Sequence, residues 1–197
     1  MPVVSRRRTT APAFFPLTLQ TAKQQCRVDG HDDDADVLFA LGASVAEFER
    51  LTGIQCLDAT FVQTFDSFWP GDLVLLPAPL RSVVSIKYDD AGDVEQTVSS
   101  SVYGVDVSAG NSPGVVYLRA SQGWPVTTSE RQSVRVEYVS GYGSERTDVP
   151  ENLRHAIASL TLHLFDNRAV VGDTGGRPAS VPFGFQSIVD GVKIHGF

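Results

Sequence analysis

The 197-residue sequence is 42% hydrophobic and 20% charged, with 16 lysines and arginines against 23 aspartates and glutamates. That composition excludes a collagen-like or wholly disordered chain, and it supplies enough apolar surface for one compact domain or two small ones. No apolar run approaches the ~18–20 residues that span a bilayer, and the basic start lacks the apolar stretch of a signal peptide. We therefore expect a soluble globular protein, made in the cytosol, without a membrane partner.

The net charge of −7 is distributed unevenly along the chain. Residues 1–28 contain five basic side chains and no acidic one, so the remainder is strongly acidic. An acidic body lacks the lysine and arginine surface that neutralises phosphates, which argues against a dedicated nucleic-acid binder. The two cysteines, Cys26 and Cys56, belong to no CxxC or Cys/His group, which favours reduced thiols over a disulfide.

Helical spacing dominates the first third of the chain after a proline-containing start. Residues 1–16 carry the Arg6–Arg8 triplet without any period, which is typical of a mobile basic arm that stays solvated or, alternatively, touches phosphates or an acidic partner. A short helix follows up to Cys26, with Thr18 as its N-cap. Apolar residues then recur every three or four positions over Asp32–Thr52, and Gly53 stands where a glycine ends a helix.

The period changes from helical to two after Cys56, which predicts about 85 residues of antiparallel strands separated by Gly, Pro and Asp turns. We expect strands at Phe61–Phe65, Leu73–Leu76, Ser82–Tyr88, Val102–Val107, Gly114–Arg119 and Ser133–Val139. Strands of this kind form a small β-sandwich or a barrel-like region.

A second long helix is predicted over Pro150–Asp166, where Leu153, Ile157 and Leu160 fall on one face. Each long helix has to bury an apolar stripe, so we expect the two helices to pack on each other with the β region inserted between them. The predicted fold class is α+β. The predicted organisation is a flexible basic arm (1–16), N-terminal helices (17–56), an inserted β domain (57–146), a C-terminal long helix (147–168) and an extended C-terminal arm (169–197).

The C-terminal arm combines several glycines with large apolar side chains that would be costly to leave in water. Either these side chains fold back on the body, or the arm docks into another subunit or a partner. Composition favours neither alternative, and docking would use Phe183, Phe185, Ile188, Val192, Ile194 and Phe197.

Motifs for catalysis, metals and cofactors are weak. The acidic run from Asp32 to Asp36 lacks the glycine and the glutamate of a calcium loop, so capping of the following helix is the better interpretation. No nucleophile elbow or phosphate-binding loop is present. We therefore predict no enzyme activity, no metal and no cofactor.

Two rival functions stay open at this stage. A carbohydrate- or partner-binding β module would use the aromatic side chains Trp69, Trp124 and Tyr142. An acid–base hydrolase would need a concave pocket around carboxylates such as Asp89 and Asp90.

Residues 17–193 contain a series of short motifs. They are Leu17-Thr-Leu19, Ala22-Lys23, Arg27-Val28, Asp33-Asp34, Leu51-Thr-Gly53, Leu75-Leu-Pro77, Pro79-Leu80, Ser82-Val83, Ser85-Ile86, Tyr88, Trp124-Pro125, Val136, Tyr138, Gly141-Tyr-Gly143, Val149-Pro150, His163 and Asn167-Arg168. In this order the sequence resembles the head–tail connector proteins (adaptor or head-completion proteins) of tailed bacteriophages, prophages and gene-transfer particles.

The resemblance implies a structural protein that forms a dodecameric ring beneath the portal and joins the DNA-filled head to the tail. It implies contacts with the portal protein, with further copies of the chain and with a stopper or tail-completion protein, while DNA passes non-specifically through the channel. Such a protein would assemble in the host cytoplasm and end at the particle neck. Ring contacts would come from the two long helices, through Leu38, Leu41, Phe48, Leu153, Ile157 and Leu160.

Overall fold

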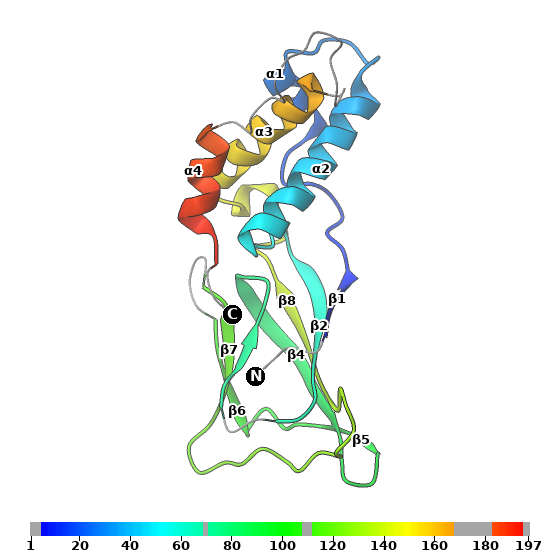
Figure 1. Cartoon of the computed structure of the whole chain (residues 1–197), viewed down its shortest axis with the longest axis vertical. Helices are drawn as coiled ribbons and strands as arrows, with labels where there is room; N and C mark the ends of the chain where they lie inside the picture. The colour runs from blue at the N-terminus through cyan, green and yellow to red at the C-terminus, as the bar shows by residue number, and fades with distance from the viewer. Residues whose placement is uncertain (1–4, 69–70, 108–111, 168–182, 195–197) are drawn as a thin grey trace, which may run out of the picture. The chain divides into compact units, whose positions relative to one another are not determined.

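The computed structural model describes residues 5–68, 71–107, 112–167 and 183–194. The chain forms two compact units, which we call the β unit (Met1–Pro12 with Asp58–Ser144) and the helical unit (Ala13–Leu57 with Glu145–Phe197) (Figure 1). The fold class is α+β, as the change of hydrophobic period predicts.

The helical unit contains three helices where helical spacing predicts them: α1 (Leu19–Cys26), α2 (Asp34–Thr52) and α3 (Glu151–Asp166). The Thr18 hydroxyl accepts a hydrogen bond from the Thr21 N–H at 3.0 Å, which confirms the predicted N-cap of α1. Gly53 ends α2 at a φ of 73°, in the left-handed region that glycine adopts without strain. A 3-10 turn, η1 (Arg146–Asp148), precedes α3.

The two long helices pack on each other, and α1 contacts both of them. The apolar stripes identified from the sequence supply the core of the helical unit, with Phe48 of α2 and Leu153 and Ile157 of α3 fully buried. The prediction that these helices form one packed body with the strands inserted between them in the chain is therefore confirmed.

A fourth helix, α4 (Phe183–Val192), corrects the prediction of an extended C-terminal arm. It packs against α3 and α2. The Phe185 ring is buried edge-on against Phe48, with 6.5 Å between the ring centroids, and Val189 is buried one turn later. The chain thus covers part of its own apolar C-terminal segment, because a helical conformation places these two side chains on one face.

The β unit contains two antiparallel sheets. The first has the order β1 (Ser5–Thr10), β2 (Ala59–Phe65), β8 (Val134–Ser140), β4 (Leu80–Asp89) and β5 (Glu95–Thr97). The second has the order β3 (Leu73–Leu75), β7 (Gly114–Leu118) and β6 (Tyr103–Asp106). The two sheets are separate and do not form a closed barrel, so the barrel-like alternative is wrong.

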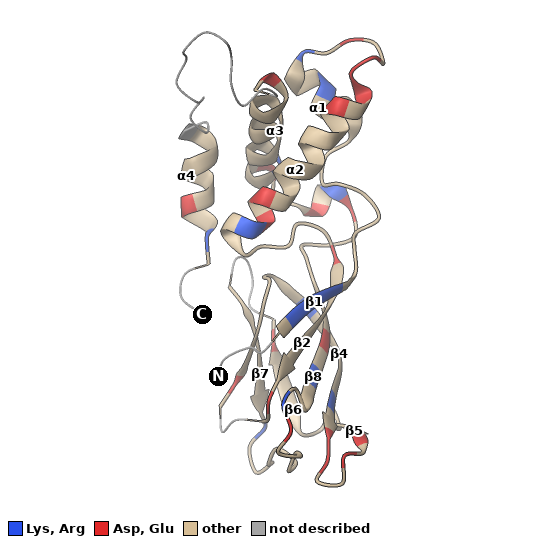
Figure 2. Cartoon of the chain, turned by 45° about the vertical axis from the view of Figure 1, so that its right-hand side comes forward, with Lys and Arg blue, Asp and Glu red and all other residues tan. Residues whose placement is uncertain are grey.

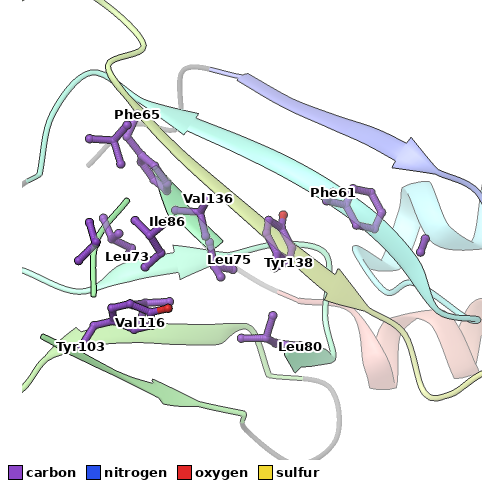
Figure 3. Packing of buried hydrophobic residues seen from close by; sticks show 13 residues of the cluster. Phe61, Phe65, Leu73, Leu75, Leu80, Ile86, Tyr103, Val116, Val136 and Tyr138 are labelled. Carbon is purple, nitrogen blue, oxygen red and sulfur yellow. The ribbon is translucent and has the colours of Figure 1, made fainter. Parts of the chain in front are cut away.

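Side chains from both sheets form one apolar core, in which Phe65, Ile86 and Val136 of the first sheet meet Leu73 and Val116 of the second (Figure 3). The fit between the sheets is tight at one glycine. A Cβ atom placed on Gly114 of β7 would lie 2.2 Å from Cβ of Leu80 in β4. The sheets can therefore approach this closely only because residue 114 has no side chain.

Buried polar side chains hold the segment that follows β3. The Gln63 amide donates to the Val74 carbonyl at 2.7 Å, the Tyr138 hydroxyl donates to the Leu76 carbonyl, and the Ser140 hydroxyl donates to the Pro77 carbonyl at 2.8 Å. Burial raises the pKa of Tyr138, so the hydroxyl keeps its proton and acts as the donor. The first sheet thus fixes the start of the connection from β3 to β4 by specific hydrogen bonds.

Strand β1 corrects the prediction of a mobile arm over residues 1–16. Ser5–Thr10 pairs antiparallel with β2, from Ser5 opposite Thr64 to Thr10 opposite Thr60. All six side chains of β1 are exposed, so hydrophobic alternation could not reveal this strand. Its backbone hydrogen bonds to a buried neighbouring strand hold it in place.

Candidate assembly surfaces

A basic edge is formed by strand β1, the outermost strand on one side of the five-stranded sheet. Arg6 pairs with the buried Gln63 and Arg7 pairs with Val62, so the two guanidinium groups leave the strand on opposite faces of the sheet. Within the described part of the chain, no ion pair joins Arg6 or Arg7 to an acidic side chain. Arg6 and Arg7 therefore give this edge positive charge that no ion pair within the described residues neutralises.

An acidic hairpin lies at the opposite side of the same sheet, and we define it as residues 89–95 between β4 and β5. It contains Asp89, Asp90, Asp93 and Glu95, and the residues from 91 to 95 are exposed (Figure 2). Arg135 binds Asp89 at 2.6 Å and Glu95 at 3.0 Å, and Lys87 binds Glu95 at 2.8 Å. Four carboxylates against two cations leave a local excess of negative charge.

Hydrogen bonds favour the charged form of three carboxylates of the acidic hairpin. Hydrogen bonds from Arg135 lower the pKa of Asp89, those from the Gly92 and Val94 N–H groups lower the pKa of Asp90, and those from Lys87 lower the pKa of Glu95. This arrangement does not fit the acid–base hydrolase, because these acids lie on an open turn and bind structural partners instead of lining a pocket. The hairpin is an anionic surface.

The ring-contact residues predicted on the long helices divide into two groups. Five of them are buried inside the helical unit and build its core: Leu41, Phe48, Leu153, Ile157 and Leu160. Because their side chains contact their own unit, they cannot also cover a neighbour, and that part of the prediction is corrected. Leu38 is 44% exposed, and the adjacent Phe39, which the sequence reasoning did not single out, is 81% exposed. An exposed phenylalanine of this degree is a candidate contact for another protein.

The predicted docking residues of the C-terminal segment also divide. Phe185 is buried in the helical unit, whereas Ile188, Val192 and Ile194 are partly exposed. The Ile194 N–H donates to the Thr52 carbonyl at 3.0 Å, which ties the end of the described segment to the end of α2. The side chains of Phe183 and Phe197 lie outside the described residues.

The acidic run before α2 makes a salt bridge and complements the helix dipole. Lys23 of α1 bonds to the Asp34 carboxylate and to the Gly30 carbonyl, and the His31 ring contacts Asp34 at 3.0 Å. Hydrogen bonding to Lys23, and then to His31, lowers the pKa of Asp34. These groups border an open hollow of about 760 Å³. Asp33, the N-cap residue, makes no side-chain capping bond, so the capping interpretation holds only for the acidic charge in the first turn.

Trp124, one of the aromatic residues of the rival carbohydrate module, packs within its own unit. The Trp124 ring stacks on Phe68 with centroids 4.7 Å apart, and Phe68 also packs against Tyr88. One face of Trp124 is therefore covered by its own unit. Trp69 lies outside the described residues.

The described residues contain no group of three or more His, Cys, Asp or Glu side chains arranged to hold a metal ion. Within those residues, no helix is long and apolar enough to cross a bilayer. Both cysteines are buried as free thiols, and burial raises the pKa of Cys56.

The chain is thus a two-unit α+β protein with a basic edge and an acidic hairpin on one sheet and an exposed phenylalanine, Phe39, on α2. No family model matches the sequence, and no curated protein sequence matches it. Solved structures do match. A chain from the virion of a native gene transfer agent particle has the same fold, with a TM-score of 0.80 and 20% identity over 98% of this chain and 97% of that one.

Two neck structures give the same result. A chain from the neck of an empty gene transfer agent particle, computed with C6 symmetry, matches with a TM-score of 0.80 and 19% identity. A chain from the neck of the native particle, computed with C12 symmetry, matches with a TM-score of 0.76 and 19% identity. Each match covers 98% of this chain and 97% of the other. At these identities the likeness establishes a shared fold.

Proposed function

We propose that this protein is a structural component of the neck of a phage-like or gene-transfer particle. The observation that carries the proposal is the match of 98% of the chain, both units included, to chains of particle necks. A match confined to one unit would reflect a common sandwich or helical bundle, and fold alone does not define function. The order of motifs that resembles connector proteins is independent support from the sequence.

In this proposal the chain acts as an adaptor: copies form a ring beneath the portal and receive a stopper or tail-completion protein on the other side. Leu38 and Phe39 are the large apolar side chains of α2 that are exposed and can contact another protein. On the C-terminal segment, Ile188 and Val192 keep accessible surface and are the residues we assign to portal contact. No catalytic step is part of the function.

The charge of the chain supports a passage for DNA through the ring. The helical unit has 13 acidic residues against 8 basic ones, and the β unit has 10 against 8. A surface of net negative charge repels phosphates, so DNA passes without binding.

The proposal is tested by deleting the gene in a host that produces the particles. We expect DNA-filled heads that lack tails, seen by negative-stain electron microscopy, and recovery of tailed particles when the gene is supplied in trans. A deletion strain that assembles tailed particles at the normal level would refute the neck function.

The contact residues are tested by complementing the deletion strain with Phe39→Ser or with Ile188→Ser/Val192→Ser. Either variant should lower the number of tailed particles, while Ser187→Ala, on an exposed position of α4, should complement fully. Full complementation by Phe39→Ser would remove α2 from the proposed contacts, and full complementation by the α4 variant would remove the portal assignment.

A further inference from the structure

Two oppositely charged surfaces lie at the two sides of one rigid sheet. In the order β1-β2-β8-β4-β5, the basic edge and the acidic hairpin are separated by the whole width of the sheet. Figure 2 shows this separation, with basic residues coloured blue on the ribbon of β1 and acidic residues coloured red at the turn beside β5. The chain cannot pair the two surfaces with each other, because the intervening strands hold them apart.

In a ring with rotational symmetry, such a pair of surfaces can form the contact between neighbouring copies. In a ring of more than two copies, every copy uses one surface toward one neighbour and a different surface toward the other. The outermost strands of a sheet face opposite directions, as such a ring requires. We propose that Arg6 and Arg7 of one copy contact the acidic hairpin of the next copy, so that the five-stranded sheets follow one another around the ring. This inference rests on the proposed neck function.

The charges also select this contact over the alternative pairings. Two β1 strands from different copies would bring like-charged arginines together, and two acidic hairpins would repel each other in the same way. Only the unlike pair is attractive. Uncompensated charge on both edges therefore favours head-to-tail contact and disfavours a two-fold dimer.

The register of the sheet adds a geometric requirement. One row of paired residues crosses the whole sheet: Ser5, Thr64, Arg135, Lys87 and Thr97. Along the strand direction, the acidic hairpin lies on one side of this row, and Arg6 and Arg7 lie on the other side. Neighbouring copies related by rotation meet at equal heights along the axis. The strands must therefore be inclined to the ring axis, and a map of the assembled neck can check this directly.

The first test is a charge exchange in the deletion strain. Arg6→Glu/Arg7→Glu reverses the basic edge, and Asp93→Asn/Val94→Lys/Gln96→Lys replaces the excess negative charge of the acidic hairpin with an excess positive charge, while the carboxylates that bind Arg135 and Lys87 are kept. A single exposed charge pair contributes little, but a ring repeats the contact in every copy, so each variant should lower the yield of tailed particles roughly tenfold or more. The combined variant should recover most of that loss.

Matched controls separate charge from folding. Arg6→Lys/Arg7→Lys keeps the charge and should assemble like the parent protein. Arg131→Glu reverses an arginine that is 81% exposed outside the edge strands and should also assemble normally. Circular dichroism of each purified variant should match the parent protein.

The second test uses cross-linking in finished particles and does not depend on assembly defects. The native cysteines are both buried, so new surface cysteines can be linked selectively. A chain with both Arg7→Cys and Asp93→Cys should give a ladder of covalent multimers with a short bismaleimide, and either substitution alone should give none.

The outcomes are distinguishable. If deletion abolishes tails but both charge variants assemble normally, or if tailed particles give no ladder, the edge contact is wrong and the neck function stands. If Arg6→Glu/Arg7→Glu leaves ring and tail intact and impairs only DNA delivery, the basic edge contacts DNA, which also overturns the inference. If deletion itself leaves tailed particles normal, the neck function fails.

Discussion

The two units satisfy their buried polar groups in different ways. In the helical unit, Ser44, Thr52 and Thr161 each donate to the carbonyl four residues earlier in the same helix. In the β unit, the buried polar side chains Gln63 and Ser140 bond to the distant segment 74–77, which joins β3 to β4. The buried polar side chains Gln63 and Ser140 of the β unit therefore position a distant part of the chain, whereas those of α2 and α3 bond within their own helix.

This difference can be tested because each unit has its own probe. Both tryptophans belong to the β unit, so their fluorescence reports its unfolding, whereas circular dichroism at 222 nm is dominated by the helices. A variant that perturbs one unit should shift one transition. If every variant shifts both transitions equally, the units unfold together and the comparison fails.

Phe185→Ala should have the largest effect. Loss of a fully buried phenylalanine leaves a cavity beside Phe48, and such substitutions cost about 3–5 kcal/mol. The transition followed at 222 nm should move to lower denaturant, while the tryptophan transition stays in place. Ser187→Ala on the exposed face of α4 is the control, and a matching loss there would show that α4 is perturbed by any substitution.

Gly114→Ala should have the next largest effect, in the other unit. The new Cβ would overlap Leu80, which is buried, so the sheets must move apart, at about 3 kcal/mol. Tryptophan fluorescence should report the loss. Gly123→Ala meets no atom within 4 Å and should leave stability unchanged within about 0.5 kcal/mol. Equal stability of the two variants would contradict the close approach of the sheets.

Comparing Tyr138→Phe with Thr161→Val tests most directly how the two units satisfy their buried polar groups. Removing the Tyr138 hydroxyl leaves the Leu76 carbonyl without this donor, which costs about 1–3 kcal/mol. Removing the Thr161 hydroxyl should cost less than about 1 kcal/mol, because the Ile157 carbonyl keeps its helical N–H partner. A larger loss for Thr161→Val, measured by denaturant unfolding, would reverse the distinction drawn between the units.

Thr18→Ala should have the smallest effect. The substitution removes the N-cap of α1 and costs about 1 kcal/mol, seen at 222 nm, whereas Thr18→Ser keeps a hydroxyl and should stay close to the parent protein. If Thr18→Ala unfolds at the same denaturant concentration as Thr18→Ser, the cap does not contribute.

Three elements were missed, the strands for one reason and the helix for another. Strands β1 and β5 expose every side chain, so the alternation on which strand prediction depends is absent there. Helix α4 does carry a signal, since Phe185, Ile188, Val189 and Val192 have helical spacing, but Gly184 and Gly191 argue against a helix by intrinsic propensity. Burial against α2 and α3 overrides that propensity.

The sequence also identified only some of the exposed contact residues. Leu38 was identified as a contact residue and is exposed, but five other residues chosen on the same helices are core, because helical spacing identifies an apolar stripe without saying what covers it. The exposure of Phe39 depends on how α1, α3 and α4 pack around α2, so only the tertiary structure shows it.

The sequence by itself determined the long helices, the Thr18 cap, the Gly53 end and most strands, because these depend on contacts between residues a few positions apart. Only the tertiary structure decided the order of the strands, the burial of α4 and the placement of basic and acidic residues at opposite sides of one sheet. Ser5 pairs with Thr64, 59 positions later, and no local preference selects such a partner. The burial of the whole unit selects pairings of this kind, and these pairings place the basic and acidic residues at opposite edges of the sheet.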